Sequence, residues 1–439
     1  MTQAVDWLTA TGVEWTDDPG ALASRRLDRS GWEPDGWPSA VAFPRAAAEV
    51  QELLRGAFAT RTPVVARGAG TALTGATTAG AGALVVDLGR MSRIVEIRAG
   101  DGVAVVEPGV ITADLDRAAA EHGLRYAPDP ASLELSTIGG NIATNAGGLR
   151  CAKYGVTRDS VLGLDVVLAD GRLISTGRST LKGVAGYDLT GLFVGSEGTL
   201  GVVVRAVLRL RPLPPPTATI AARFASVDAA AAASVALTSA RLQPVLAELL
   251  DAATLSALGR GSSGALLIVQ VDGGPGEAAL AVDVLRRTAE AVDSTGDPEE
   301  LLAARRNALP AIERLGRPLI EDIAVPRSRL ADAVREIASI ARRHDVPICT
   351  LAHAGDGNLH PIIVAPPGAA TIPAPVHRAA ADIFELALRL GGTVTGEHGV
   401  GTLKRAWLSR ELGPDNHALQ RELKALLDPR DILNPGKAI

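Results

Sequence analysis

The stretch Thr137-Ile-Gly139-Gly140-Asn141-Ile-Ala-Thr-Asn145-Ala-Gly147-Gly148 points most directly to the fold of the first half of the chain. It holds four glycines and two asparagines in twelve residues, so its own side chains cannot pack a hydrophobic core. Glycines allow a backbone to approach a ligand closely, and Asn and Thr side chains supply directional hydrogen bonds. The stretch therefore predicts close backbone contact with a large, flat ligand.

Three further segments belong to the same pattern. Arg67-Gly68-Ala69-Gly70-Thr71 follows a predicted strand, and its small residues let successive N–H groups face one phosphate. It lacks the Gly-Lys-Ser/Thr of a Walker A loop and the GxGxxG of a Rossmann fingerprint, so taken alone it is equally a tight turn. Pro128-Asp129-Pro130-Ala131-Ser132 is a rigid turn, and Gly195-Ser-Glu197-Gly198-Thr199-Leu-Gly201 is another glycine-rich loop. Together these segments favour one binding site over unrelated turns.

The chain has 439 residues, which is too long for a single hydrophobic core. Short strand patterns with glycine punctuation fill the part before the proline cluster at 212–216, including a hairpin around Asp170-Gly171. Longer helix patterns alternate with strands beyond that cluster. We predict an α+β protein whose second domain has an antiparallel sheet with helices on one face.

Composition limits the possible functions. The net charge of -5 argues against nonspecific binding of nucleic acid. Two cysteines without a CxxC cannot by themselves hold an iron–sulfur cluster, and they indicate no disulfide framework. The amino terminus does not resemble a signal peptide, and no apolar run is long enough to span a bilayer. We therefore expect a cytoplasmic protein. Attachment at the inner face of the membrane, as an alternative, would need a partner or an amphipathic surface.

Three of the seven histidines lie in His353-Ala-Gly-Asp-Gly-Asn-Leu-His360 and Gly396-Glu397-His398-Gly399. If residues 355–358 form the turn of a hairpin, His353 lies directly opposite His360, with Cβ atoms about 4.5–5.5 Å apart. Two imidazoles at that spacing can bind one metal ion. A purely structural histidine pair is the alternative.

Glu397 and His398 would face opposite sides of a regular strand, but the flanking glycines can kink the chain and bring both to one cavity. Three protein ligands and an open position define a catalytic metal site. We assign His353, His360 and Glu397 as ligands of zinc or manganese, between which the sequence does not choose. His398 is then the candidate general base, because the ordinary pKa of imidazole lies near neutral pH.

The quoted segments resemble the flavin-binding segments of the vanillyl-alcohol oxidase family. More specifically, residues 43–437 are similar to glycolate oxidase flavoprotein subunits and to D-lactate and D-2-hydroxyglutarate dehydrogenases. The resemblance implies an extension (1–36), a two-lobed PCMH-type FAD-binding domain (37–214), a substrate or cap domain (215–418) and a segment that returns to the FAD domain (419–439). It also implies noncovalent FAD, because Thr71 stands where some members carry a flavin-linked histidine.

The resemblance implies that the FAD pyrophosphate lies on residues 67–71. The FAD contacts that it implies are Arg67, Gly68, Ala69, Gly70, Thr71, Pro128, Asp129, Ser132, Thr137, Gly139, Gly140, Asn145, Gly148, Glu197, Gly198, Val202 and Asn434.

The resemblance also implies a substrate class. Arg305 matches an arginine that grips the substrate carboxylate, and Ile320 and Leu309 stand where enzymes for 2-hydroxyglutarate have a lysine and a threonine. A smaller D-2-hydroxyacid, such as glycolate or D-lactate, or one with an apolar side chain, is therefore expected. It would be oxidised to the 2-oxoacid with hydride transfer to flavin N5.

The electrons would pass to an external quinone, cytochrome or electron-transfer protein. Partner subunits or a homodimer are also expected. The alternatives are a catalytically silent flavin-binding accessory subunit and a metal-dependent hydrolase whose glycine loops bind a nucleotide.

Overall fold

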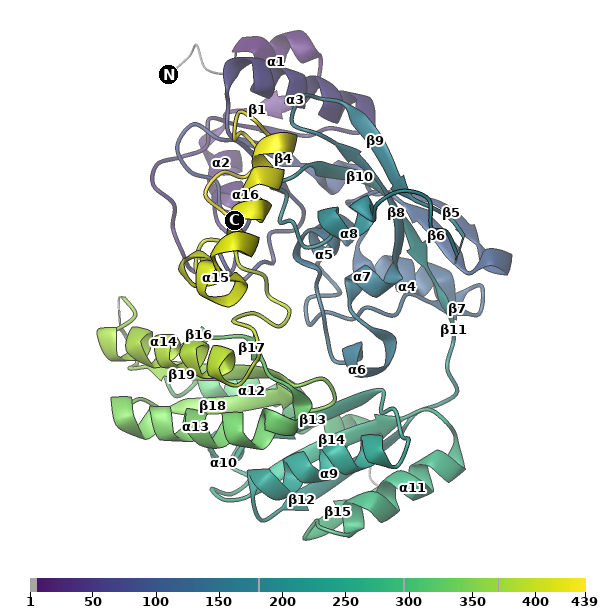
Figure 1. The fold of residues 1–439 in the computed structure, drawn as a ribbon, viewed down its shortest axis with the longest axis vertical. Coiled ribbons are helices and arrows are strands. Elements are labelled where there is room, and N and C mark those ends of the chain that lie inside the picture. The colour runs from purple at the N-terminus through teal and green to yellow at the C-terminus, as the bar shows by residue number, and fades with distance from the viewer. Residues whose placement is uncertain (1–5, 181, 295–296, 370) are drawn as a thin grey trace. The chain divides into compact units, whose positions relative to one another are not determined.

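A computed structural model describes residues 6–180, 182–294, 297–369 and 371–439 (Figure 1). The chain divides into two compact units. The first unit comprises Met1–Gly148, Gly155–Leu213 and Glu397–Ile439, and the second comprises Leu149–Tyr154 and Pro214–Gly396. The backbone thus enters the second unit twice, briefly at residues 149–154 and then at 214–396, and each time returns to the first.

The first unit contains a four-stranded sheet in the order β1 (Trp15–Thr16), β2 (Ala40–Ala42), β4 (Leu84–Asp87), β3 (Val64–Arg67). Strands β2 and β3 run parallel to β4, and both β2 and β4 are buried along their whole length. Strands that are buried along their whole length need cover on both faces. Their core includes Leu53 and Leu54 of α3 (Ala47–Thr60) and Leu8 of α1 (Asp6–Thr11). Strand β1 comes from the stretch expected as an amino-terminal extension, as does α2 (Pro19–Arg26).

A second sheet of the first unit is antiparallel, in the order β5 (Ile94–Arg98), β6 (Val103–Val106), β10 (Val202–Arg209), β8 (Val161–Val167), β9 (Leu173–Gly177). The predicted hairpin at Asp170-Gly171 is confirmed, because Val167 pairs with Leu173. Helices α4 (Thr112–Ala120), α5 (Ile138–Thr144) and α8 (Leu189–Phe193) add apolar side chains to this core. The unit also contains the short elements β7 (Leu124–Arg125), α7 (Thr157–Ser160) and β11 (Arg211–Pro212).

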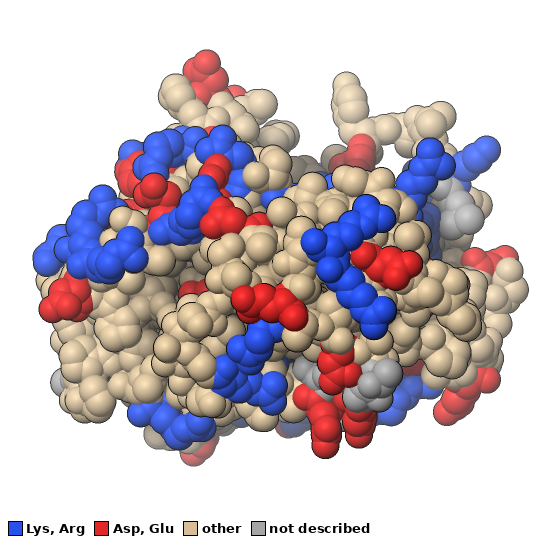
Figure 2. All heavy atoms as spheres, turned by 90° about the horizontal axis from the view of Figure 1, so that it is seen from below, with Lys and Arg blue, Asp and Glu red and all other residues tan. Residues whose placement is uncertain are grey.

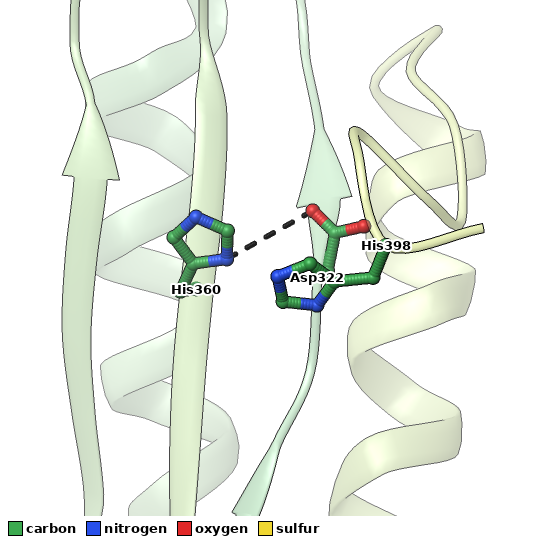
Figure 3. A group of neighbouring side chains, drawn as sticks. All are labelled: Asp322, His360 and His398. Carbon is green, nitrogen blue, oxygen red and sulfur yellow. Dashed lines mark ion pairs between the residues drawn. The ribbon is translucent and has the colours of Figure 1, made fainter. Parts of the chain in front are cut away.

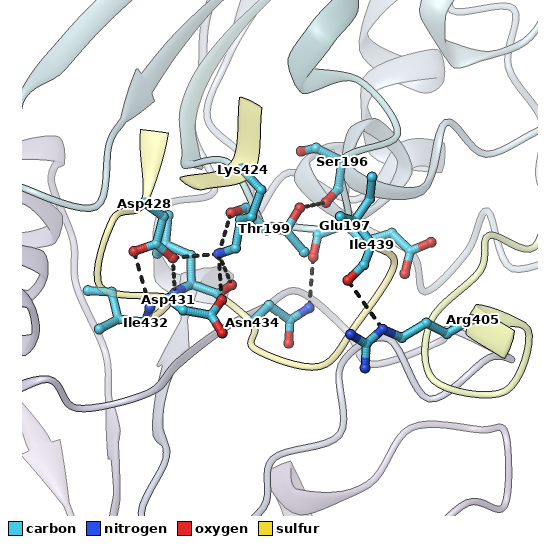
Figure 4. A network of polar contacts seen from close by, with 11 residues as sticks. Ser196, Glu197, Thr199, Arg405, Lys424, Asp428, Asp431, Ile432, Asn434 and Ile439 are labelled. Carbon is cyan, nitrogen blue, oxygen red and sulfur yellow. Dashed lines mark hydrogen bonds and ion pairs between the residues drawn. The ribbon is translucent and has the colours of Figure 1, made fainter. Parts of the chain in front are cut away.

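The end of the chain is joined to the first sheet after α15 (Arg405–Leu412) and α16 (Pro414–Leu427). Val64 donates to the carbonyl of Ile432 at 2.7 Å and accepts from the N–H of Asn434 at 2.8 Å, so this segment lies beside β3. Asp428, which is 1% exposed, accepts from the N–H groups of Ile432 and Leu433 and pairs with Lys424 (Figure 4). A buried carboxylate therefore fixes the last turn of the chain.

The second unit is built on one antiparallel sheet, and its strands follow in spatial order: β15 (Ala291–Asp293), β12 (Ala218–Phe224), β14 (Ala265–Val271), β13 (Leu246–Leu250), β18 (Ile348–His353), β19 (Asn358–Ala365), β16 (Arg317–Ile320). Strand β17 (Ile323–Ala324) also pairs with β19. The short helix α6 (Cys151–Tyr154) belongs to this unit, where the Tyr154 hydroxyl donates to Asp272 at 2.5 Å.

Helices cover both faces of this sheet (Figure 1). Helices α9 (Val227–Ser239), α11 (Pro275–Arg286), α13 (Leu330–His344) and α14 (Ala374–Arg389) lie on one face. Helices α10 (Ala252–Ala257) and α12 (Pro298–Glu313) lie on the other, where Leu255 and Ala308 join a core with Leu246, Ile268 and Leu351. The α+β class is confirmed. The sequence pattern predicted helices on one face of this sheet, whereas the structure has them on both. Strands β13 and β19 are buried on both sides and need two layers of helices.

The helices on the first of these faces carry charged side chains of both signs. Arg343 lies 3.3 Å from Asp382, and Arg389 lies 3.9 Å from Glu336. The face of the molecule drawn in Figure 2 shows basic and acidic side chains interspersed rather than gathered by sign. Within the described part of the chain, no helix is both long enough and apolar enough to cross a membrane.

The Asp428 carboxylate gives a test of the fold. We expect Asp428→Ala to lower the free energy of unfolding by about 3–5 kcal/mol, because it leaves two buried N–H groups without their acceptor and removes the buried carboxylate that pairs with Lys424. The matched control is Asp431→Ala, since the Asp431 side chain is 69% exposed and 3.3 Å from the same lysine. That exposed pair should contribute only about 0–1 kcal/mol. Urea unfolding followed by circular dichroism measures both, and equal midpoints would contradict the assigned role.

Candidate functional site

The hairpin that carries the two predicted metal-binding histidines is formed by β18 and β19. Its register differs from the prediction, because His353 pairs with Asn358 and Leu351 pairs with His360. The turn starts one residue earlier than expected, and Gly357, with a φ of 90°, closes it. This change moves each cross-strand partner by two residues, so both histidines still face the same side. They are diagonal neighbours, and their ring centroids are 5.0 Å apart.

Each of these histidines has a fully buried carboxylate behind it. The Nδ1 of His353 lies 2.6 Å from Oε1 of Glu248, and the Nδ1 of His360 lies 3.9 Å from Oδ1 of Asp322 (Figure 3). Glu248 and Asp322 are both 0% exposed. The two Nε2 atoms face each other at 3.1 Å. Both imidazoles therefore direct their Nε2 atoms to one point.

The other oxygen of Glu248 holds Arg305. The Nε of Arg305, on α12, donates to Oε2 of Glu248 at 2.7 Å, and the arginine side chain is 21% exposed. Burial opposes ionisation of Glu248, but the charges and hydrogen bonds of His353 and Arg305 outweigh it and hold the pKa of Glu248 below its usual value. The predicted substrate arginine and a predicted metal ligand thus share one carboxylate.

The chain segment that leads to Glu397 and His398 is anchored in the second unit. Thr395 donates from its hydroxyl to Asp322 at 2.8 Å. Gly396 lies against the side chain of Asn358, where an added Cβ would come within 2.5 Å of the amide oxygen. The next peptide bond takes the backbone into the first unit, which begins again at Glu397. His398 (labelled in Figure 3) follows directly.

The residues after His398 are held within the first unit by Glu197. Its two carboxylate oxygens accept from the N–H groups of Val400 at 2.6 Å and Gly401 at 2.8 Å. Burial raises the pKa of Glu197 to about 7, although both amides and Lys437 favour its ionised form. Glu197, expected as a cofactor contact, thus supports the segment that carries His398.

A cleft of about 830 Å³ in the first unit is lined by Arg67, Gly68 and Ala69 of the loop at residues 67–71. Gly68 lies so close to Thr137 that an added Cβ would come within 2.2 Å of its hydroxyl oxygen. Gly139 approaches Pro108 in the same way, at 2.6 Å. These two glycines therefore let the chain pack closely, without a side chain of its own, against Thr137 and Pro108.

Arg67 ties this loop to neighbouring backbone segments. Its guanidinium donates to the carbonyls of Leu27 at 2.8 Å and Thr77 at 3.2 Å, and its burial lowers its pKa. Ser24 and Arg25 of α2 also line the cleft, and Arg25 lies 3.0 Å from Asp87. Sequence reasoning placed both residues in an extension and did not connect them with a site.

Several other predicted FAD contacts have clear structural roles. Asn145 ends α5 in a left-handed conformation and accepts from the N–H of Arg158 at 2.9 Å. Gly148 lies against Asp129, where an added Cβ would come within 2.3 Å of the carbonyl oxygen. The Val202 side chain lies in the hydrophobic core of the first unit.

Buried polar atoms without partners lie beside the same loop. Among the described residues, the hydroxyls of Thr74, Thr77 and Thr402 and the Oδ1 of Asn434 have no hydrogen-bond partner. Backbone contacts bring them together, because Thr402 donates to the carbonyl of Thr74 at 2.9 Å and the Asn434 amide donates to that of Ala76 at 2.9 Å. Buried unpaired groups are expected where a ligand supplies the missing partner. They suit the hydrogen-bonding edge of a flavin ring.

Two family models match this chain in the expected order. The model for an FAD binding domain matches residues 38–177, and the model for the C-terminal domain of FAD linked oxidases matches residues 213–438. The chain belongs to the FAD-linked oxidases. It is an oxidoreductase with an FAD-binding domain, as the sequence predicted.

Relatives of this oxidase cover nearly its whole length. Over 418 residues it is 45% identical to the glycolate oxidase subunit GlcD of Bacillus subtilis. That alignment covers 91% of this chain and 88% of the relative. Over 417 residues it is 34% identical to a D-lactate dehydrogenase of Archaeoglobus fulgidus, with 91% of each chain covered. Among solved structures, p-cresol methylhydroxylase with substrate bound aligns at a TM-score of 0.79 and 16% identity, covering 99% of this oxidase and 96% of that chain. The last likeness supports the predicted PCMH-type fold alone.

Sequence reasoning missed the two carboxylates behind the histidines. Glu248 is the one charged residue of β13, Leu246-Ala-Glu-Leu-Leu250, and a carboxylate in an apolar strand is a signal that could have identified it. Asp322 lies in a short connection between strands and carries no comparable signal.

The approach of Gly68 to Thr137 gives a test of the cleft. We expect Gly68→Val to weaken FAD binding at least tenfold, because the new side chain displaces Thr137, whose hydroxyl caps α5 by accepting from Gly140 at 3.2 Å. The matched control is Gly100→Val, at a position where an added Cβ meets nothing within 4 Å. Titration of the apoprotein, followed by FAD fluorescence, measures both. An unchanged affinity in Gly68→Val would refute the assignment of the cleft.

Proposed function

We propose that this oxidase converts a small D-2-hydroxyacid, such as glycolate or D-lactate, to the 2-oxoacid and passes the electrons to an acceptor outside the chain. The observation that carries this proposal is the arrangement in the second unit. The Nε2 atoms of His353 and His360 face each other, and each histidine has a buried carboxylate on its Nδ1 side. Arg305 is hydrogen-bonded to one of these carboxylates, Glu248.

The proposed metal ligands are His353, His360 and Glu397, with zinc or manganese as the ion. When Nδ1 of His353 donates to Glu248, its Nε2 presents a lone pair towards His360, so a cation or a shared proton must separate the rings. The two Nε2 atoms, 3.1 Å apart, are the groups that would hold the ion. Glu397 is bonded directly to Gly396, which packs on this hairpin, and it would add an oxygen ligand.

Arg305 would bind the substrate carboxylate. Its Nε is engaged by Glu248, so the two terminal nitrogens of the fork are the groups proposed to meet the substrate. Leu309 of α12 and Ile320 of β16 both pack against the apolar cluster that α12 helps to form. Their side chains are uncharged, so neither position offers a charge to a second carboxylate. This supports a small monocarboxylate or one with an apolar side chain.

His398 would accept the proton of the substrate hydroxyl. Imidazole suits this task near neutral pH, and Glu197 fixes the backbone two and three residues further on. When bound, FAD supplies the acceptor for the hydride, and the metal supplies a Lewis acid for the hydroxyl oxygen.

The acceptor would be a quinone, a cytochrome or an electron-transfer protein. The two cysteines of the chain are too few for an iron–sulfur cluster of four thiolates, which supports an acceptor elsewhere. The Bacillus relative is named as a subunit, which supports association with partner subunits. Attachment at the inner face of the membrane would follow from such a partner, and a homodimer is the simpler alternative.

Anaerobic mixing of the flavin-loaded protein with hydroxyacids tests the proposal. We expect D-lactate or glycolate to bleach the visible flavin absorption, whereas L-lactate, the matched control, should not. His398→Ala should slow bleaching by about 10²-fold or more with its FAD content unchanged. Removal of metal by a chelator should also slow it, and added zinc or manganese should restore it. A yellow protein that no D-hydroxyacid bleaches would contradict the proposal and favour an accessory flavin subunit.

A further inference from the structure

We propose that Glu248 is a positioning residue that couples two parts of the substrate site, orienting His353 with one carboxylate oxygen and Arg305 with the other. This inference rests on the proposed function, in which His353 binds a metal and Arg305 binds the substrate carboxylate. Glu248 lies outside the glycine-rich and histidine-containing motifs, and its two partners come from a distant strand and a distant helix.

The position of Glu248 in the sheet accounts for both contacts. Glu248 on β13 is directly opposite His353 on β18 in the antiparallel ladder. Cross-strand partners share one face, which is also the face that α12 covers with Arg305. One oxygen is therefore 2.6 Å from Nδ1 of the histidine, and the other is 2.7 Å from Nε of the arginine.

The carboxylate is matched to this task by its two equivalent acceptors. Both partners present N–H donors to it, and a fully buried carboxylate needs such donors to offset the loss of water. By accepting from Nδ1, Glu248 fixes the tautomer of His353 and leaves Nε2 for a metal. By accepting from Nε, it sets the direction of the arginine fork. One side chain thus sets the geometry of both groups.

Asp322 provides a comparison within the same site. Its Oδ1 lies 3.9 Å from Nδ1 of His360, which is an ion-pair separation and not a hydrogen bond like the 2.6 Å contact of Glu248 with His353. Its second oxygen accepts from the Thr395 hydroxyl at 2.8 Å. Its loss should therefore disturb the metal without disturbing Arg305. Asp322→Asn and Glu248→Gln are a matched pair of carboxylate-to-amide substitutions that separate the coupling from a general loss of buried charge.

The experiment uses flavin-loaded wild type, Glu248→Gln and Asp322→Asn. Zinc affinity is measured by competition with a chromophoric chelator. In the metal-stripped proteins, affinity for propionate, a monocarboxylate without a hydroxyl group, is measured by calorimetry. We expect Glu248→Gln to weaken zinc binding about 10–100-fold and propionate binding at least tenfold, because an amide has only one acceptor oxygen. We expect Asp322→Asn to weaken zinc binding alone.

The outcomes separate the coupling from the function on which it rests. Weaker zinc binding with unchanged propionate binding in Glu248→Gln overturns the coupling and leaves the proposed function standing. Wild type that binds neither zinc nor propionate overturns the proposed function, and the coupling falls with it. If Glu248→Gln does not fold, Glu248→Asp gives the second test. Its shorter carboxylate cannot span both partners, so it should weaken at least one of the two affinities tenfold, and retention of both would overturn the proposal.

Discussion

The burial of two carboxylates inside the sheet of the second unit is the constraint on which the proposed site depends. Removing a carboxylate from water costs several kcal/mol unless donors surround it. Glu248 and Asp322 are both fully buried. The donors that contact them are therefore held in place, because moving a donor away would leave a buried charge unpaired. His353, Arg305 and Thr395 are such partners. Because the sheet beneath them is covered by helices on both faces, neither carboxylate can relax towards solvent, and the side chains that they contact keep their orientation.

The first unit meets a different requirement, which is space for a large cofactor beside a closely packed backbone. At positions 68 and 139 the neighbouring residues leave no room for a side chain larger than that of glycine. Buried threonine hydroxyls and an asparagine oxygen without hydrogen-bond partners lie beside the loop of residues 67–71. Glu197 then links this region to the segment after His398 through two backbone N–H groups. The group proposed to move a proton is thus carried by the backbone of the unit that binds the cofactor, while the groups proposed to hold the substrate belong to the other.

Local features of the sequence were predictable, and long-range ones were not. The hairpin at Asp170-Gly171 and the glycine-rich loops depend on neighbouring residues, so their patterns predicted them. The hairpin of His353 and His360 kept its predicted turn length but shifted by one residue, because Gly357 provides the positive φ that closes it. The two histidines still lie on the same face of the sheet, because each cross-strand partner moved by two residues and side chains alternate between faces. Glu248 depends on β13 pairing with β18, 105 residues away, and no local pattern indicates that pairing.

We propose that His353 and His360 bind one metal ion through their Nε2 atoms. Diffraction from crystals of the active, flavin-loaded protein, collected on both sides of the zinc and manganese absorption edges, tests it directly. We expect a single anomalous peak within bonding distance of both Nε2 atoms. An active enzyme with no peak there, or with its only metal bound elsewhere, would contradict it.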